Sequence, residues 1–512
     1  MSRRVPVRVI APGKVPPSRA IAWATAIAAI VAVAPIYLLW LNDVPLGESG
    51  KFIYRYSPFF VRHLQAALLL LPIAGGILLA GRLLCASKIL WQRIGVAVLA
   101  LVVASLAAWT WWAPPNALSQ HAFNLSSPAH DGAFVIEAQR VGSINEFLRT
   151  FDQSLHRTVE EMRGTRVLSN PPGTTLLAVA VLRLFPPQPA DPKWIERAIE
   201  DEGVSDPAQV AQLSSSIRVG LALTILWAAS AIFAYLLGRL FLSPLGAGAF
   251  TLLVLFNPAT VCFTPGKDPV QLFTINAMLW AWFAGWRKDR PAMSILAGAF
   301  LVLGMVIGLI HLWVAMAAIL ASAWQNWRQG RSLVTLLMRH VLPCMAGALF
   351  LCSAIAFVSG WNIPATLLAV GHRFPEIQKA LQYDRTLWFF IGLPLFLLFL
   401  SGGFWAFAGL RLRHRAWGFG ASLLAATVLA MLATYLLGIT YELPRLWVAF
   451  VPLLLLAAMA DQPLLHGRNT RRALVPVMLL VIVAILATGL HWSIMDARET
   501  EYRVFSSERM FW

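Results

Sequence analysis

The sequence contains little charge. Asp, Glu, Lys and Arg make up 13% of its 512 residues, whereas 58% of the residues are hydrophobic and the mean hydropathy is +0.68. Soluble domains average about a quarter charged residues, so this composition excludes a soluble globular protein. A helix of about 20 apolar residues crosses a bilayer, and the many such runs predict an all-α polytopic membrane protein with about 11–14 transmembrane helices.

Cysteine is scarce, and several cofactor motifs are missing. The chain has no CxxC pair, no HExxH, no GxxxxGK[ST] loop and no Rossmann glycine pattern. These absences argue against a nucleotide-driven pump and leave a metal or nucleotide cofactor without a motif. We therefore expect no cofactor, and no residue is assigned as a metal ligand. Four cysteines lie in or beside apolar runs and are typical of small buried hydrophobes: Cys85, Cys262, Cys344 and Cys352.

The net charge of +17 comes from basic residues that are clustered in short loops between apolar runs. Examples are the segments 285–291, 326–331 and 411–415. Such loops are typical of the cytoplasmic side of a membrane protein, so nucleic acid is not expected as a partner. We expect a multi-pass protein of the bacterial cytoplasmic (inner) membrane, in contact with membrane lipid.

The apolar runs divide the chain into five parts. The longest polar stretch is an external loop that is expected to carry short amphipathic helices. Residues 135–151 are one example, because apolar residues recur there every three or four positions and suit the membrane surface. The five parts are a cytoplasmic tail at 1–19, N-terminal transmembrane helices at 20–113, the extracytoplasmic loop region at 114–216, a transmembrane core at 217–492 and a C-terminal tail at 493–512.

A short apolar run at 173–185 directly follows the sequence Asn-Pro-Pro at 170–172. Proline is tolerated in the first turn of a helix, where no intrahelical bond needs its missing N–H. Every strongly basic loop falls on the cytoplasmic side only if this run does not fully cross the membrane. We therefore favour a re-entrant or tilted half-helix. The alternative is a full crossing, with 292–324 as one long helix.

Asp131 is the first candidate for chemistry. It follows His130 and precedes a glycine in the external loop. A carboxylate that is held ionised there can act as a general base on an acceptor hydroxyl. An aspartate before a glycine is also ordinary turn chemistry. The local sequence alone favours the turn.

Two further constellations combine an acid with a base near the end of a span. Lys267 and Asp268 follow a Pro-Gly turn at a helix start, where N–H groups can bind phosphate. A surface ion pair fits that pattern equally well. Glu442 and Arg445 lie at the outer end of a span, where charge is expensive and often functional, and arginine can clamp phosphate. The alternative there is an interfacial ion pair between aromatic anchors.

Three more polar residues stand in apolar surroundings or in an outer loop. His311 lies inside an apolar run, and His372 and Arg373 are adjacent in the segment 369–377. Each of the three, taken alone, is more typical of a satisfied polar residue than of a ligand.

Four stretches, in this order, resemble the GT-C superfamily of membrane glycosyltransferases, near its bacterial mannosyl- and aminoarabinosyl-transferases. They are AHDGAF (129–134), GTRVLSNPPGTTLL (164–177), FTPGKDPVQLF (263–273) and YELPRLWVAFVP (441–452). Three features depart from the superfamily pattern. Asn170 replaces a histidine, the first long loop has no Asp-Asp or Asp-x-Asp pair, and an N-terminal hairpin at 20–84 is additional.

The resemblance implies an integral membrane glycosyltransferase that takes a sugar from a polyprenyl-phosphate donor. Asp131 would deprotonate the acceptor hydroxyl, and Lys267 and Arg445 would neutralise the leaving phosphate. His372 and Arg373 would be further phosphate-binding residues. The acceptor would be an extracytoplasmic cell-envelope glycan or glycolipid. The remaining residues expected at the cavity are His130, Asn170, Asp268, Glu442 and His311.

Other functions remain open on the sequence. A transporter or flippase of lipid-linked saccharides would favour internal repeats and polar residues at the membrane midplane. The sequence contains neither an internal repeat nor such a distribution. A polymerase or ligase of surface polysaccharide would share the long outer loops and basic residues. An inactive relative of the transferases would fit Asn170 and the missing acidic pair.

Overall fold

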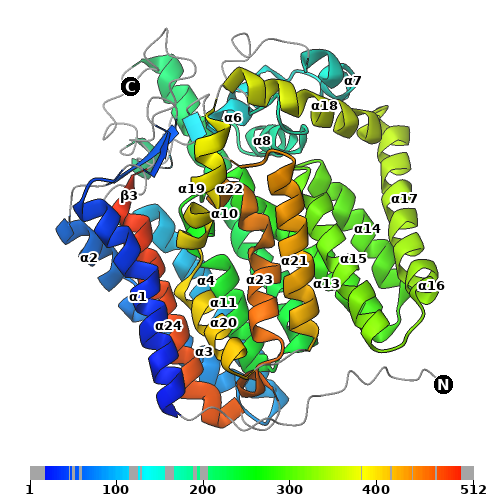
Figure 1. Cartoon of the computed structure of the whole chain (residues 1–512). Helices are drawn as coiled ribbons and strands as arrows, with labels where there is room; N and C mark the ends of the chain where they lie inside the picture. The colour runs from blue at the N-terminus through cyan, green and yellow to red at the C-terminus, as the bar shows by residue number, and fades with distance from the viewer. Residues whose placement is uncertain are drawn as a thin grey trace.

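The structure is a computed structural model of the chain (Figure 1). It describes residues 18–44, 46–48, 52–56, 60–114, 121, 125–126, 130–155, 166–187, 193–196, 206–381, 383–414, 418–440, 442–466 and 470–496. The parts of the predicted tails at 1–17 and 497–512 lie outside these residues.

Almost all of the described chain is helical. The first half contains α1 (Ser18–Leu41), α2 (Phe60–Leu68), α3 (Leu71–Leu84), α4 (Ile89–Trp112), α6 (Gly132–Arg140), α7 (Ile144–Ser154), α8 (Gly173–Leu184), α10 (Pro207–Phe241), α11 (Pro244–Leu255) and α12 (Pro258–Val261). The second half contains α13 (Lys267–Lys288), α14 (Pro291–Met305), α15 (Ile310–Arg328), α16 (Leu333–Leu336), α17 (Leu342–Ser359), α18 (Ile363–Leu381), α19 (Arg385–Leu398), α20 (Gly402–His414), α21 (Phe419–Leu436), α22 (Leu443–Leu446), α23 (Val451–Met459) and α24 (Thr470–Ile494). A π-helical turn (Leu337–Val341) joins α16 to α17, and 3₁₀ turns follow α22 (Trp447–Phe450) and α23 (Pro463–Leu465).

The predicted fold class, an all-α polytopic membrane protein, is confirmed. Within the described residues, 7 helices are long and apolar enough to cross a membrane, or 8 if α19 and α20, bent by 90°, form one span. Four shorter apolar helices accompany them, among them α11 and α14. The expected count of about 11–14 spans included short apolar segments of this kind.

The helix α8 is too short to cross a bilayer. Its 12 residues extend about 18 Å, against a hydrocarbon core of about 30 Å. It lies at the end of the bundle with α6 and α7 (Figure 1). Residues 292–324 do not form the one long helix that a full crossing by the run at 173–185 would require, because α14 ends at Met305 and α15 begins at Ile310. The half-helix interpretation agrees with both observations.

The expected amphipathic helix at 135–151 is interrupted. It forms α6 and α7, because Ser143 leaves the helical conformation and its side chain caps α7 by accepting from the Glu146 N–H. The apolar stripe also faces protein rather than the membrane surface. Val135 and Ala138 are buried in a cluster with residues of α8 and α10, such as Val179.

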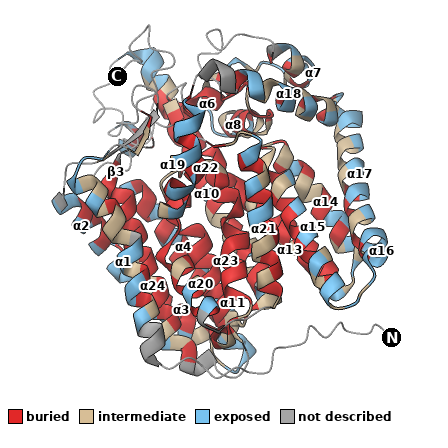
Figure 2. Ribbon diagram, in the orientation of Figure 1, coloured by how far each residue is buried: buried red, intermediate tan, exposed pale blue. Residues whose placement is uncertain are grey.

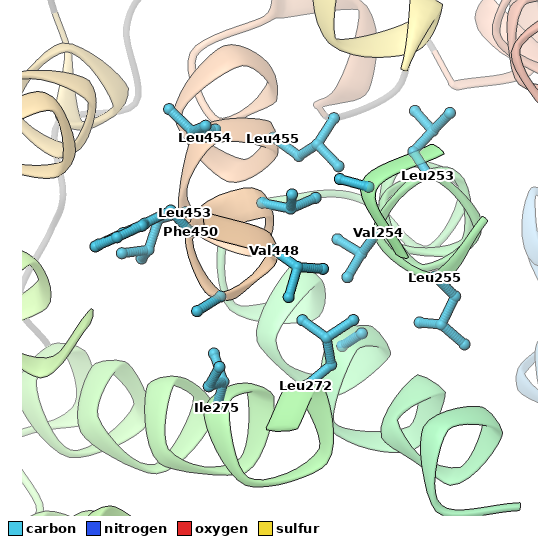
Figure 3. Close-up of a cluster of buried hydrophobic side chains, with 14 of the residues drawn as sticks. Leu253, Val254, Leu255, Leu272, Ile275, Val448, Phe450, Leu453, Leu454 and Leu455 are labelled. Carbon is cyan, nitrogen blue, oxygen red and sulfur yellow. The ribbon is translucent and has the colours of Figure 1, made fainter. Parts of the chain in front are cut away.

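Buried residues fill the centre of the bundle, and exposed residues lie on the outer helices (Figure 2). Many of the exposed residues are large and apolar, such as Leu101 on α4 and Leu349 on α17. Every residue of α23 is buried, which suits a helix that is apolar on all sides. Its side chains and those of the preceding 3₁₀ turn meet α11 and α13 (Figure 3). By contrast, α17 lies at the edge, and Phe357 there is 92% exposed. Such exposure is expected for a side chain that contacts lipid.

A small antiparallel sheet, absent from the sequence-based expectations, joins the two ends of the described chain. It consists of β1 (Leu46–Glu48), β2 (Phe52–Tyr56) and β3 (Met495–Asp496). Glu48 is buried and accepts hydrogen bonds from the Asp384 N–H (2.9 Å) and the Trp388 indole (3.0 Å) at the start of α19. The N-terminal hairpin, whose role the sequence does not indicate, is therefore fixed to α19.

Candidate functional site

A buried group of charged side chains lies where α6, α8, α13 and α22 begin. It comprises Asp131 before α6, Arg166 before α8, Lys267 and Asp268 in the first turn of α13, and Glu442 and Arg445 at α22. We call these six residues the ion-pair cluster. The elements α6, α8 and α22 lie towards the upper end of the bundle in Figure 1.

Asp131 is held by the start of α13. Its Oδ2 accepts a hydrogen bond from the Lys267 main-chain N–H at 2.6 Å, and its Oδ1 lies 3.6 Å from Nη1 of Arg166. The N-terminal end of a helix and a guanidinium both attract a carboxylate. Oδ1 accepts no hydrogen bond from any described residue. One oxygen of Asp131 is thus fixed, and the other is available to accept a proton.

Gly266 permits this approach of Asp131 to α13. A Cβ added at Gly266 would lie 2.7 Å from Oδ2 of Asp131 and 2.6 Å from the carbonyl oxygen of Phe263. Both distances are shorter than real Cβ contacts. The glycine in the Pro-Gly-Lys-Asp stretch is therefore required for close packing.

Asp268 is the residue on which the cations converge. Its Oδ1 lies 3.1 Å from Nζ of Lys267 and accepts a hydrogen bond from Gln271 at 2.8 Å. Its Oδ2 lies 3.2 Å from Nε of Arg445 and 3.8 Å from Nη1 of Arg166. Asp268 is only 2% exposed. A buried carboxylate in this position offsets the charge of its neighbours.

Lys267 also has a neutral partner. Its Nζ donates to Oδ1 of Asn170 at 2.6 Å, and the Asn170 amide nitrogen donates to the Arg166 carbonyl at 2.8 Å. The Asn170 side chain therefore accepts a hydrogen bond from the Lys267 ammonium and fixes the turn before α8.

Arg445 is paired a second time, with Glu442. Glu442 is fully buried and has φ of 51°, the left-handed region that non-glycine residues rarely adopt. This conformation costs about 1–3 kcal/mol, which the surrounding structure must supply. The backbone at α22 is thus constrained to present Arg445 to Asp268.

His130 lies next to Asp131 and is buried. Burial, with the charge of Arg166, lowers its pKa to about 3, although Asp131 opposes the shift. The imidazole is therefore neutral at physiological pH.

His311 is connected to the cluster along one face of α13. Its Nε2 lies 2.8 Å from Oγ1 of Thr274, whose hydroxyl lies 3.0 Å from the Gln271 carbonyl, one turn from Asp268. Its Nδ1 lies 2.8 Å from the Gly308 carbonyl. His311 thus orders the contact between α13 and the start of α15.

His372 and Arg373 lie on α18, which packs on α7 through a hydrogen bond from Thr366 to Asp152 of 3.1 Å. The side chain of His372 is exposed, and Arg373 forms an ion pair with Glu376. The ion pairs and hydrogen bonds that define the cluster do not include these two residues. Their predicted contact with phosphate stays a prediction.

The Asn-Pro-Pro-Gly stretch positions the cluster from the α8 side. The Gly173 N–H donates to the Val306 carbonyl at 2.7 Å, and a Cβ at Gly173 would overlap that carbonyl oxygen. The stretch therefore holds the start of α8 against the end of α14. Asn170 then lies within reach of Lys267.

The structure brings Asp131, Lys267 and Arg445 into one cluster, and the chemical roles predicted for them stay predictions. Two members of the site were not singled out from the sequence, Arg166 and Gln271. Arg166 belongs to the basic stretch before Asn170, and Gln271 lies one turn after Asp268 on the same helix face. Helical spacing could have indicated Gln271. No local pattern indicated Arg166.

Comparisons with protein-family models and with curated proteins find no match. Within the described residues, no group of three or more His, Cys, Asp or Glu side chains could hold a metal ion. The chain is thus a multi-pass, all-helical membrane protein in which three acids and three bases form a largely buried cluster.

Proposed function

We propose that this protein is a membrane glycosyltransferase that moves a sugar from a polyprenyl-phosphate donor to an extracytoplasmic acceptor, a cell-envelope glycan or glycolipid. The observation that carries the proposal is the ion-pair cluster. Oδ1 of Asp131, which accepts no hydrogen bond from the described residues, belongs to the same cluster as the cations Lys267 and Arg445, and both cations pair with Asp268. The GT-C-like motifs that contain these residues support the same class of reaction.

In the proposed reaction, the acceptor hydroxyl attacks the anomeric carbon of the donor sugar. Its proton passes to Oδ1 of Asp131 while a new carbon–oxygen bond forms. The bond from the anomeric carbon to the phosphate oxygen breaks, and its electron pair leaves with that oxygen. The lipid phosphate gains one negative charge as Asp131 loses one. General-base catalysis of this kind contributes about 10²–10⁴-fold.

Lys267 and Arg445 would stabilise the charge on the leaving phosphate. Lys267 is buried and the Arg445 side chain is 11% exposed, and fixed cations in such a low-dielectric site stabilise developing charge better than cations in water. His130 is neutral, because its pKa is lowered to about 3, and so does not add charge beside the base. His372 and Arg373 would contact the phosphate only if the donor reaches α18.

The experiment compares Asp131→Asn with wild type in a strain from which the gene has been deleted. Mass spectrometry of envelope glycans and lipid-linked sugars should show a missing sugar and an accumulated donor in the deletion strain. A gene encoding Asp131→Asn should leave the sugar missing and the donor accumulated. The control Asp152→Asn on α7 should return both to their wild-type levels. Full restoration by Asp131→Asn would refute the assigned base.

An assay with the purified protein separates a transferase from a flippase. A purified transferase converts donor and acceptor to product in detergent, without two membrane faces. Product formation by the purified wild type, lost in Asp131→Asn, is expected. Activity that appears only in sealed vesicles would assign the protein to transport instead.

A further inference from the structure

We infer that Asp268 competes with the donor phosphate for Lys267 and Arg445 and thereby promotes release of the lipid-phosphate product. This inference rests on the proposed function. Asp268 would be a positioning residue that holds two phosphate-binding cations in place. It would form its ion pairs with them again after the sugar has been transferred.

The contacts of Asp268 carry the inference. Its Oδ1 contacts Lys267 and its Oδ2 contacts Arg445, at 3.1 and 3.2 Å. Gln271, whose amide donates to Oδ1, fixes the carboxylate in the first turn of α13. A phosphate that approaches either cation therefore meets a side chain that is already paired. Because the group is buried, each pairing is stronger than in water.

The phosphate becomes more negative during the reaction, so competition from Asp268 matters most for release of the product. The donor phosphate is a diester with one negative charge, and the product is a monoester with up to two at neutral pH. Cations without a counterion would hold the product more tightly than the donor. Asp268 lowers affinity for both, and re-forming its ion pairs offsets the loss of the departing phosphate.

Asp131 provides a matched comparison in the same cluster. Both residues are buried aspartates, and replacement by asparagine removes one negative charge in each case. Asp131, however, contacts the Lys267 main-chain N–H and Arg166, not the Lys267 ammonium or Arg445. The two substitutions therefore separate pairing with the phosphate-binding cations from a general change in charge.

The test measures binding to the full-length protein in detergent, with a polyprenyl monophosphate and with inorganic phosphate as probes. Asp268→Asn should bind the polyprenyl monophosphate about tenfold more tightly than wild type, because Lys267 loses its carboxylate partner and Arg445 loses one of its two. Asp131→Asn should tighten binding less. A gain confined to the lipid probe would identify a site that also requires the polyprenyl chain. A gain for both probes would identify a phosphate site. Unchanged or weaker binding in Asp268→Asn, or an equal gain in both variants, would overturn the inference.

A second pair of variants guards against misfolding of Asp268→Asn. Arg166→Gln with Asp268→Asn removes one cation and one acid, so the cluster stays balanced. Its phosphate affinity should exceed that of Arg166→Gln alone. No gain over that single variant would also overturn the inference.

Kinetics provide a readout that a purely structural role would not change. Asp268→Asn should lower KM for the donor and lower kcat, with turnover limited by release of the lipid phosphate. Tighter phosphate binding without sugar transfer by wild type would refute the transferase and leave Asp268 as a competitor for anions. Sugar transfer by wild type without tighter binding in the variant would refute the role of Asp268 alone.

Discussion

The two ends of α13 carry similar groups in opposite surroundings. At its first turn, Asp268 is 2% exposed and meets Lys267, Arg445 and Arg166. After its last turn, Asp289 pairs with Arg339 and lies near His340, and the side chains of Asp289 and Arg339 are 38% and 51% exposed. Burial strengthens electrostatic interactions and raises the cost of breaking them, whereas water screens the exposed pair.

Burial therefore distinguishes the ion-pair cluster, for which we propose a function, from an ordinary ion pair at a helix end. A charged group inside a membrane protein is expensive and is retained where function needs it. An exposed pair at a helix end costs little and is worth little. Substitutions in the cluster should therefore have larger effects than a substitution at the exposed pair.

Arg445→Met should have the largest effect on stability. It leaves Glu442, which is fully buried, without its arginine partner and removes one counterion of Asp268. Breaking a buried pair in this way costs about 3–5 kcal/mol. Denaturant unfolding in detergent is the measurement. The double variant Arg445→Met with Glu442→Gln should recover part of the loss. A single variant as stable as wild type would show that the cluster is solvated.

Gly266→Ala should have an intermediate effect. The added methyl group would push Asp131 away from the Lys267 N–H, and overpacking of this kind costs about 1–3 kcal/mol. Transfer activity should fall further than stability. The control is Gly371→Ala on α18, where a Cβ meets no atom within 4 Å. Equal behaviour of the two variants would remove the close approach of Asp131 from the description of the site.

Glu48→Leu tests the N-terminal hairpin at a distance from the cluster. It removes the acceptor of the Asp384 N–H and the buried Trp388 indole, at a cost of about 1–3 kcal/mol for groups left unsatisfied. The helix α19 also packs on Arg445's helix, where Gly392 lies against the Leu443 side chain. Stability should fall, and transfer activity should fall with it, whereas Glu48→Gln retains an acceptor and both properties. Hydrogen exchange at α19 would localise the change. Unaltered hydrogen exchange at α19 in Glu48→Leu would show that Glu48 does not stabilise this helix.

These predictions depend on contacts that the sequence indicates unequally. The fold class was predictable, because long apolar runs fix helices in a membrane. Asp131, Lys267 and Arg445 were predictable as a set from the order of four short motifs. The bond between Asp131 and Lys267 spans 136 positions in the sequence, however, and that between Glu48 and Trp388 spans 340. No local period encodes such pairings, so the central place of Asp268 and the contribution of Arg166 required the packed structure.

Asp289→Asn should have the smallest effect. It removes the same charge as Asp268→Asn, but from a pair that water already screens, so the expected loss of stability is about 0–1 kcal/mol. Asparagine also tolerates the left-handed backbone at this position, where φ is 51°. Phosphate affinity and donor KM should stay at the wild-type values, since the pair lies at the opposite end of α13 from the cluster. Added salt should abolish the small stability difference, because screening weakens exposed pairs most. A loss of several kcal/mol, or a change in phosphate affinity, would show that burial does not distinguish the two ends of α13.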